Sequence, residues 1–83
     1  MSNMTIKKFA EALGHTEEAL TERMKQDGIM QNTDPVRPYR EYVRRGYFDV
    51  TEYQGYVLDV SLTGKGQVWL ARLFPAGFVF GAK

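Results

Sequence analysis

A lysine between two glycines stands just before an apolar helical pattern, in the stretch LTGKGQVWLARLF at residues 62–74. Glycine-rich loops of this kind bind phosphate in nucleotide-binding proteins, because backbone N–H groups and the lysine ammonium face the anion. A P-loop needs four residues between its first glycine and a Gly-Lys-Ser/Thr, but here Gln67 follows Gly66. A dinucleotide fingerprint also fails, because its third glycine is missing. We therefore interpret residues 64–66 as a strand-to-helix turn with Thr63 as a candidate cap.

Arginines form the most concentrated positive charge in the chain. Arg37, Arg40 and Arg44 follow one another at i, i+3 and i+7. Guanidinium groups suit phosphate pairs, and each neutralised phosphate adds about 0.9 to the slope of log affinity against log salt. A DNA contact is therefore predicted from this row and the following turn, at Arg37, Arg40, Arg44, Arg45, Lys65 and Gln67. The alternative is an ordinary solvated face, partly compensated by Glu41.

The second predicted helix has an acidic outward face. At 100° per residue, this face gathers Glu17, Glu18, Thr21, Glu22 and Lys25. Three carboxylates repel DNA phosphates before any base is read. The face therefore argues against DNA readout by this helix, and it predicts docking on a basic surface of a partner protein.

Residues for catalysis or metal binding are scarce. The chain has no cysteine, which excludes a disulfide framework and a zinc-thiolate site. Its one histidine, His15, lies in a predicted turn as a surface or capping residue, and Asp49 and Asp59 lie on a predicted hairpin that shows them to solvent. We expect no enzymatic activity, no catalytic residue, no metal site and no cofactor.

Two short helices are predicted at the start of the chain. The stretch TIKKFAEALG has helical apolar spacing and ends at Gly14, and EEALTERMKQDG places Leu20 and Met24 on one face. A helix-turn-helix has a small residue in its first helix, a glycine four residues later and an apolar residue six further on. Ala10, Gly14 and Leu20 match these three positions.

The middle of the chain predicts a brief strand in GIM, a turn-rich segment, and a short helix in YREYVRRG. From Tyr47 the apolar period changes to two, so YFDVTEY and YVLDVSL read as a hairpin that turns at Gln54 and Gly55. Tyr53 and Tyr56 flank this turn, where they either pack across the strands or stack on a nucleotide or partner.

A closing helix is predicted over residues 67–74. Val68 and Ala71 are expected to face inward, and Leu70 and Phe74 are further candidates for this face. Trp69 on this helix either packs inward or forms an exposed apolar patch with Phe74, Phe78 and Phe80. The tail AGFVFGAK predicts either a last strand or an exposed apolar terminus.

Length and composition indicate one globular unit. The 83 residues are 43% hydrophobic with a net charge of +1, and a chain of this size buries roughly 60% of its unfolded surface. The charge is uneven, because residues 1–34 carry four basic and six acidic groups whereas residues 35–83 carry seven and four. We expect a single domain over residues 1–83, with candidate flexible tails at 1–4 and 75–83. No apolar run reaches the length of a membrane span and no signal peptide is apparent, which predicts a cytoplasmic protein.

Two motifs in order resemble the KilA carboxy-terminal (KilAC) domain of phage antirepressor proteins. The first is Y-x-x-Y-x-x-x-G-Y-F and the second T-x-K-G-Q, formed here by Tyr39, Tyr42, Gly46, Tyr47 and Phe48, and by Thr63, Lys65, Gly66 and Gln67. The resemblance covers residues 5–74. It implies a small α+β, winged-helix-like domain with an N-terminal helix-turn-helix, a β-hairpin wing and a closing helix, in a DNA-binding transcriptional regulator of a phage or prophage within the bacterial cell.

Two departures from that family pattern stand out. The hairpin before T-x-K-G-Q is usually longer and more polar than the Gln54-Gly55 turn found here. Full-length members of the family also carry a separate amino-terminal domain.

Two functions compete on this sequence. The leading hypothesis is a DNA-binding domain that contacts phosphates through the arginine row, weakly or with help from other domains. The alternative is a protein-interaction module that inactivates a phage repressor through the acidic second helix. Loss of Arg40 and Arg44 should abolish binding in the first case, whereas Glu18 and Glu22 should matter in the second.

Overall fold

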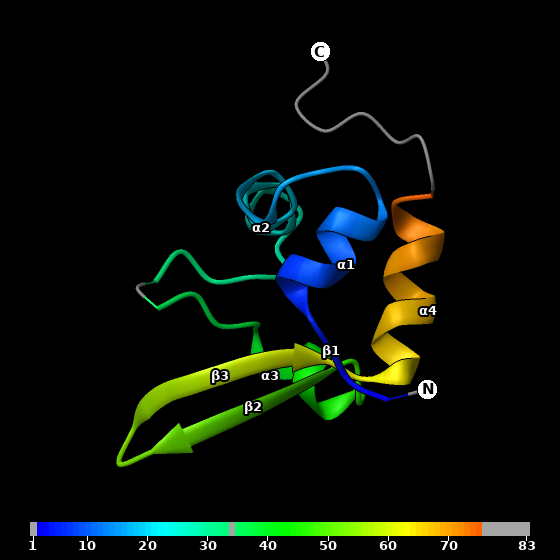
Figure 1. Ribbon diagram of the computed structural model, residues 1–83. Coiled ribbons are helices and arrows are strands. Elements are labelled where there is room, and N and C mark those ends of the chain that lie inside the picture. The colour runs from blue at the N-terminus through cyan, green and yellow to red at the C-terminus, as the bar shows by residue number, and fades with distance from the viewer. Residues whose placement is uncertain (1, 34, 76–83) are drawn as a thin grey trace.

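The computed structural model describes residues 2–33 and 35–75 and confirms the predicted α+β class (Figure 1). The described residues form four helices and a three-stranded antiparallel sheet. In order they are β1 (Met4–Thr5), α1 (Ile6–Ala12), α2 (Glu17–Gln26), α3 (Arg40–Arg44), β2 (Phe48–Tyr53), β3 (Tyr56–Leu62) and α4 (Gly64–Leu73). No helix among the described residues is long and apolar enough to span a membrane.

The first two helices form where the sequence predicts them. The Thr5 hydroxyl accepts the Lys8 amide and the Thr16 hydroxyl accepts the Ala19 amide, each at 3.1 Å, so both helices begin with a side-chain cap. Gly14 ends the first helix with φ +84°, a conformation that glycine adopts at little cost. Figure 1 shows α2 almost end-on while α1 lies across the view, so the two helices cross steeply.

The sheet has the strand order β1-β3-β2. The predicted hairpin is confirmed, with Gln54 and Gly55 both at positive φ in its turn. Its register shifts between Thr51 and Glu52, because Thr51 faces Asp59 whereas Glu52 faces Val57. Leu58 is thus an extra residue in β3, a β-bulge. The strand predicted in GIM is reduced to one isolated bridge between Met30 and Pro38.

The predicted start of the last helix is wrong. It begins at Gly64, three residues early, because the Thr63 hydroxyl accepts the Gly66 amide at 3.0 Å and caps it there. The predicted inward face is also partly wrong, because Val68 and Ala71 are exposed. The buried side of α4 carries Gly66, Gln67, Leu70 and Phe74.

Residues 3 and 4, within the candidate flexible tail at 1–4, contact the sheet. Met4 pairs with Leu62 in the sheet, and Asn3 Nδ2 donates to Asp49 Oδ2 at 2.7 Å and to Ser61 Oγ at 3.2 Å. These contacts fix the start of the chain on the sheet. The candidate apolar tail at residues 76–83, with Phe78 and Phe80, lies outside the described residues.

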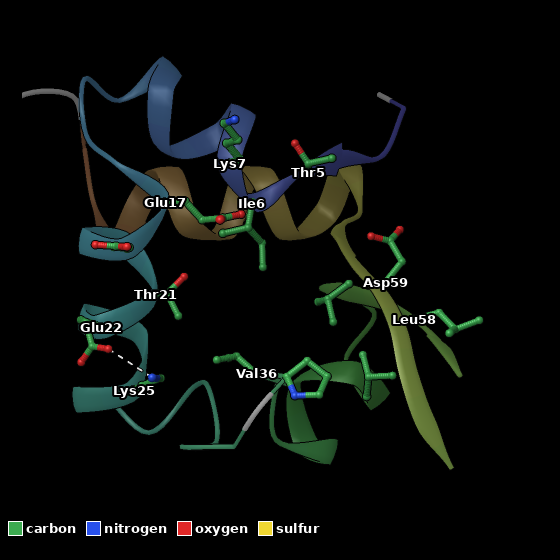
Figure 2. Close-up of a pocket in the computed structure, with 14 residues that line it drawn as sticks. Thr5, Ile6, Lys7, Glu17, Thr21, Glu22, Lys25, Val36, Leu58 and Asp59 are labelled. Carbon is green, nitrogen blue, oxygen red and sulfur yellow. Dashed lines mark hydrogen bonds and ion pairs between the residues drawn. The ribbon is translucent and has the colours of Figure 1, made fainter. Parts of the chain in front are cut away.

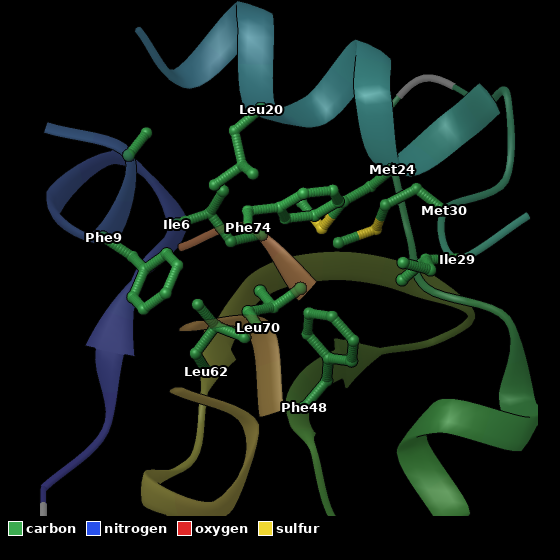
Figure 3. Close-up of a cluster of buried hydrophobic side chains, with 11 residues drawn as sticks. Ile6, Phe9, Leu20, Met24, Ile29, Met30, Phe48, Leu62, Leu70 and Phe74 are labelled. Carbon is green, nitrogen blue, oxygen red and sulfur yellow. The ribbon is translucent and has the colours of Figure 1, made fainter. Parts of the chain in front are cut away.

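One apolar core joins the helices to the inner face of the sheet (Figure 3). Ala10 and Leu20 are fully buried, as the close crossing of α1 and α2 requires. The other core side chains lie on α1, α2, β2, β3 and α4, in the segment after α2, and at the C-cap of α4. They are Ile6, Phe9, Met24, Ile29, Met30, Phe48, Leu62, Leu70 and Phe74. Because this core takes the inward face of α2, the opposite face of that helix is directed outward.

Candidate functional site

A wide groove of about 780 Å³ opens between α2, the start of α1, β3 and residues 35–36 (Figure 2). It brings together all five residues that the sequence assigns to the outward face of the second helix, namely Glu17, Glu18, Thr21, Glu22 and Lys25. The sequence-predicted partner face is therefore one wall of a concave surface.

Local structure explains how α2 presents this wall. The Thr16 cap starts the helix immediately before Glu17 and Glu18, so both carboxylates lie in the first turn, where the helix dipole favours negative charge. Leu20 and Met24 are buried on the core side. The acidic side chains consequently face the groove and solvent.

The groove carries a negative balance. Four carboxylates line it, from Glu17, Glu18 and Glu22 on α2 and from Asp59 on β3, against Lys7 and Lys25. Lys25 Nζ lies 3.1 Å from Glu22 Oε1, so these two charges largely neutralise each other. Among the described residues, Glu17, Glu18 and Asp59 form no ion pair.

The wall opposite α2 is mostly apolar. Val57, Leu58 and Val60 contribute it from β3, and Ile6 and Val36 add to it, with Val36 directed into the middle of the space (Figure 2). Leu58 is 65% exposed although it is a large aliphatic side chain. An exposed apolar surface beside unpaired carboxylates is typical of a protein-binding site.

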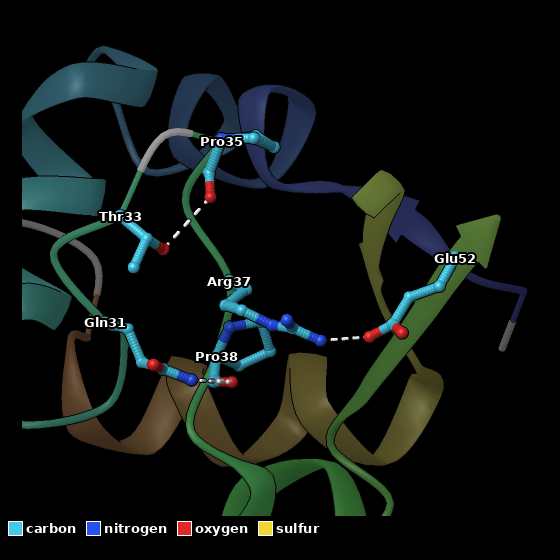
Figure 4. Close-up of polar contacts among 6 residues, drawn as sticks. All are labelled: Gln31, Thr33, Pro35, Arg37, Pro38 and Glu52. Atoms are coloured by element: carbon cyan, nitrogen blue, oxygen red, sulfur yellow. Dashed lines mark hydrogen bonds and ion pairs between the residues drawn. The ribbon is translucent and has the colours of Figure 1, made fainter. Parts of the chain in front are cut away.

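The arginine row is less uniform than its spacing predicts. Arg37 lies before α3, and it forms an ion pair with Glu52 of β2 that ties the segment before α3 to the hairpin (Figure 4). Arg45 pairs with Glu41 at 3.3 Å. Arg40 and Arg44 are exposed and form no ion pair with any other residue that the structure describes. These two arginines form the available part of the row.

Lys65 and Gln67, the other residues predicted for DNA, differ sharply. Lys65 is exposed at the start of α4, with its ammonium 5.5 Å from the ring centre of Tyr47. Gln67 is only 7% exposed, and its amide donates to the carbonyl oxygens of Ser2 at 2.7 Å and Leu62 at 3.3 Å. Gln67 is therefore removed from the predicted DNA contacts, because its donors hold the chain terminus and β3 together.

The aromatic residues have separate roles. Tyr47 and Tyr42 both stack against Trp69, with centroid distances of 4.2 and 5.3 Å, so α3 and α4 are joined by rings. Phe74 is buried in the core rather than in an exposed patch. Tyr53 and Tyr56 face each other across the hairpin end and are 62% and 73% exposed.

The sequence reasoning missed the β3 wall of the groove. The signal available was the adjacent apolar pair Val57-Leu58, which breaks the alternation expected of a strand with one buried face. The bulge at Leu58 accounts for that break.

Comparison with known proteins agrees with the motifs. The family model described as "Phage antirepressor protein KilAC domain" matches residues 1–76. The chain is 36% identical to the protein kilA of Escherichia phage P1 in an alignment 89 residues long, which covers 92% of this chain and 32% of that protein. The chain thus spans about a third of the length of this relative. No solved structure matches. The family-model match over nearly the whole chain shows that it belongs to the KilAC domain family of phage antirepressor proteins.

Proposed function

We propose that this domain acts in phage gene regulation, in the cytoplasm of the bacterial host, by binding a basic segment of a repressor in the groove. The observation that carries this proposal is the composition of the groove. Glu17 and Glu18 lie on one wall and form no ion pair within residues 2–33 and 35–75, and exposed Leu58 lies on the other wall. Repressors contact DNA phosphates through lysine and arginine. A protein that covers such a basic surface prevents the repressor from binding DNA.

The charges of the groove favour this partner over DNA itself. A duplex brought to α2 would place its phosphates against Glu17, Glu18 and Glu22, and this repulsion rises as salt falls. A cationic protein segment meets the opposite potential and is steered toward the groove. The apolar side chains of β3 then add the favourable free energy of burying apolar surface, because exposed charge pairs alone contribute little to affinity.

Calorimetric titration of the repressor of the same phage with the domain tests this proposal. Each exposed charge pair contributes about 0.2–1 kcal/mol, so replacing two carboxylates in E17Q/E18Q should weaken binding by roughly tenfold. Glu11→Gln is the matched control, because Glu11 is exposed on α1 and does not line the groove. If E17Q/E18Q and the parent protein bind the repressor with equal affinity, the groove is not the binding site.

A second candidate function is DNA binding through the exposed face of α3. It is favoured by Arg40 and Arg44, which are exposed without an ion pair among the described residues, and by Lys65 nearby on α4, beside the Gly46-Tyr47 segment that follows α3. Anisotropy of a labelled duplex of random sequence, measured at about 50 and 200 mM salt, tests it. In R40A/R44A the slope of log affinity against log salt should fall by about 1.8, the value for two phosphate contacts. Arg72→Ala, on α4, is the control, and a slope unchanged by R40A/R44A counts against this candidate.

We also propose that the domain is a winged helix in which the β2–β3 hairpin is the wing. The proposal is supported by a steeply crossed helix pair that precedes the hairpin, and by the short β1 that completes the sheet in the order β1-β3-β2. An experimentally determined structure compared with known winged helices tests it. A different packing of the hairpin on the helix pair would refute it.

A further inference from the structure

One edge of β3 is open along most of its length. β2 pairs with the strand from end to end on one side, but β1 covers only Ser61 and Leu62 on the other. Within residues 2–33 and 35–75, no strand pairs with that second edge over residues 57–60. Unpaired backbone N–H and C=O groups on a strand edge are a template for another strand.

The reason for the open edge lies in the sequence of β1. Thr5 is both the last residue of β1 and the cap of α1, where its hydroxyl accepts the Lys8 amide. The chain therefore turns into a helix at Ile6 instead of continuing along β3. No other strand of the described residues takes the path that a longer β1 would follow.

The acidic groove lies along this same path. Val57, Leu58, Asp59 and Val60 all line it, and successive side chains of a strand point to opposite faces. A space that touches four consecutive residues therefore borders the edge of the strand and not one face. Thr5 also lines the groove, which places the end of β1 at one end of the space.

We propose that an extended, basic segment of the partner protein adds to the open edge of β3 as a fourth strand, in line with β1. This inference rests on the function proposed above and specifies how the groove binds. Four residues of strand span roughly 13 Å, and main-chain hydrogen bonds supply affinity while alternate side chains supply specificity. Lysine or arginine side chains reach Glu17, Glu18 and Asp59, and apolar side chains contact Val57 and Val36.

Charge complementarity selects a partner protein over a second copy of this chain. Two copies paired through this edge would bring Asp59 and the α2 carboxylates of each against those of the other. The bulge at Leu58 further discourages a long flat pairing between identical edges. A short cationic strand does not meet this charge repulsion.

The test uses two synthetic peptides with the domain. The first is a labelled, N-acetylated seven-residue peptide of alternating lysine and valine, and the second is the same peptide with every main-chain amide N-methylated. Both carry the same charge, but the methyl groups remove the N–H donors and block strand pairing. We expect the unmethylated peptide to bind at least tenfold more tightly and to slow amide hydrogen exchange at residues 57–60, measured by NMR.

Each outcome decides the inference. Equal binding of both peptides without protection at residues 57–60 overturns strand addition but leaves capture by charge intact. If neither peptide binds, strand addition is also overturned. The repressor titration then tests the proposed function separately. If slowed amide exchange at residues 57–60 is lost in E17Q/E18Q but kept in the Glu11→Gln protein, the peptide contacts both the α2 wall and the β3 wall of the groove.

Discussion

The most exacting prediction concerns Gly66 in the first turn of α4. A Cβ added at this position would lie 1.9 Å from the carbonyl oxygen of Tyr47, far inside any normal contact. That oxygen also accepts the Thr63 amide at 3.1 Å. The glycine thus allows α4 to lie directly on the backbone that links α3 to β2.

Two opposing effects act in Gly66→Ala. Alanine in a helix is favoured over glycine by about 1 kcal/mol. Against this, overpacking costs about 1–3 kcal/mol and the loss of the bond from Thr63 to Tyr47 about 1 kcal/mol. The net loss is about 2 kcal/mol, which for a domain of this size lowers the melting temperature by about 10 °C.

Thermal and urea unfolding, followed by circular dichroism, measure this change. Lys65→Ala is the matched control, because it changes the exposed neighbour in the same helical turn. It should leave stability within about 0.5 kcal/mol of the parent, as surface substitutions do. A Gly66→Ala protein as stable as the parent, or more stable, would refute the close approach of α4 to Tyr47.

Three further substitutions have defined outcomes. Gln67→Met keeps the length of the side chain but leaves the carbonyl of Leu62 without its amide partner, so urea unfolding should show a loss of about 2 kcal/mol; an unchanged midpoint would contradict the buried role. Thr16→Ala removes the cap on the Ala19 amide and should cost about 1 kcal/mol in the same assay, and no loss would show that α2 starts without it. Gly55→Ala places a side chain at φ +85° and should cost about 1 kcal/mol, measured as a lower melting temperature; a gain in stability would exclude the positive-φ turn.

Features that depend on near neighbours in sequence were predicted well. Thr5 caps α1 and Gly14 ends it, because both act through contacts a few residues away. The phase of α4 was not predicted, because it is set by the contact of Gly66 with Tyr47, nineteen residues earlier. Apolar spacing alone favoured Val68, which the structure leaves exposed.

The candidate site also has a part that the sequence predicted and a part that it did not. The acidic face of α2 follows from helical periodicity, so Glu17 and Glu18 could be placed together from sequence. The opposite wall depends on sheet register and on the bulge at Leu58, which no local pattern specifies. The pairing of Arg37 with Glu52 likewise joins a loop to a strand, and it divides the arginine row that sequence spacing had treated as one surface.

Displacement of the repressor of the same phage from its labelled operator DNA tests the central claim most directly. Fluorescence anisotropy follows release of the DNA as parent domain, E17Q/E18Q or R40A/R44A is added. We predict that the parent and R40A/R44A release the DNA at similar concentrations, whereas E17Q/E18Q requires roughly tenfold more. Full activity of E17Q/E18Q together with loss in R40A/R44A would contradict the account and move the functional surface to α3.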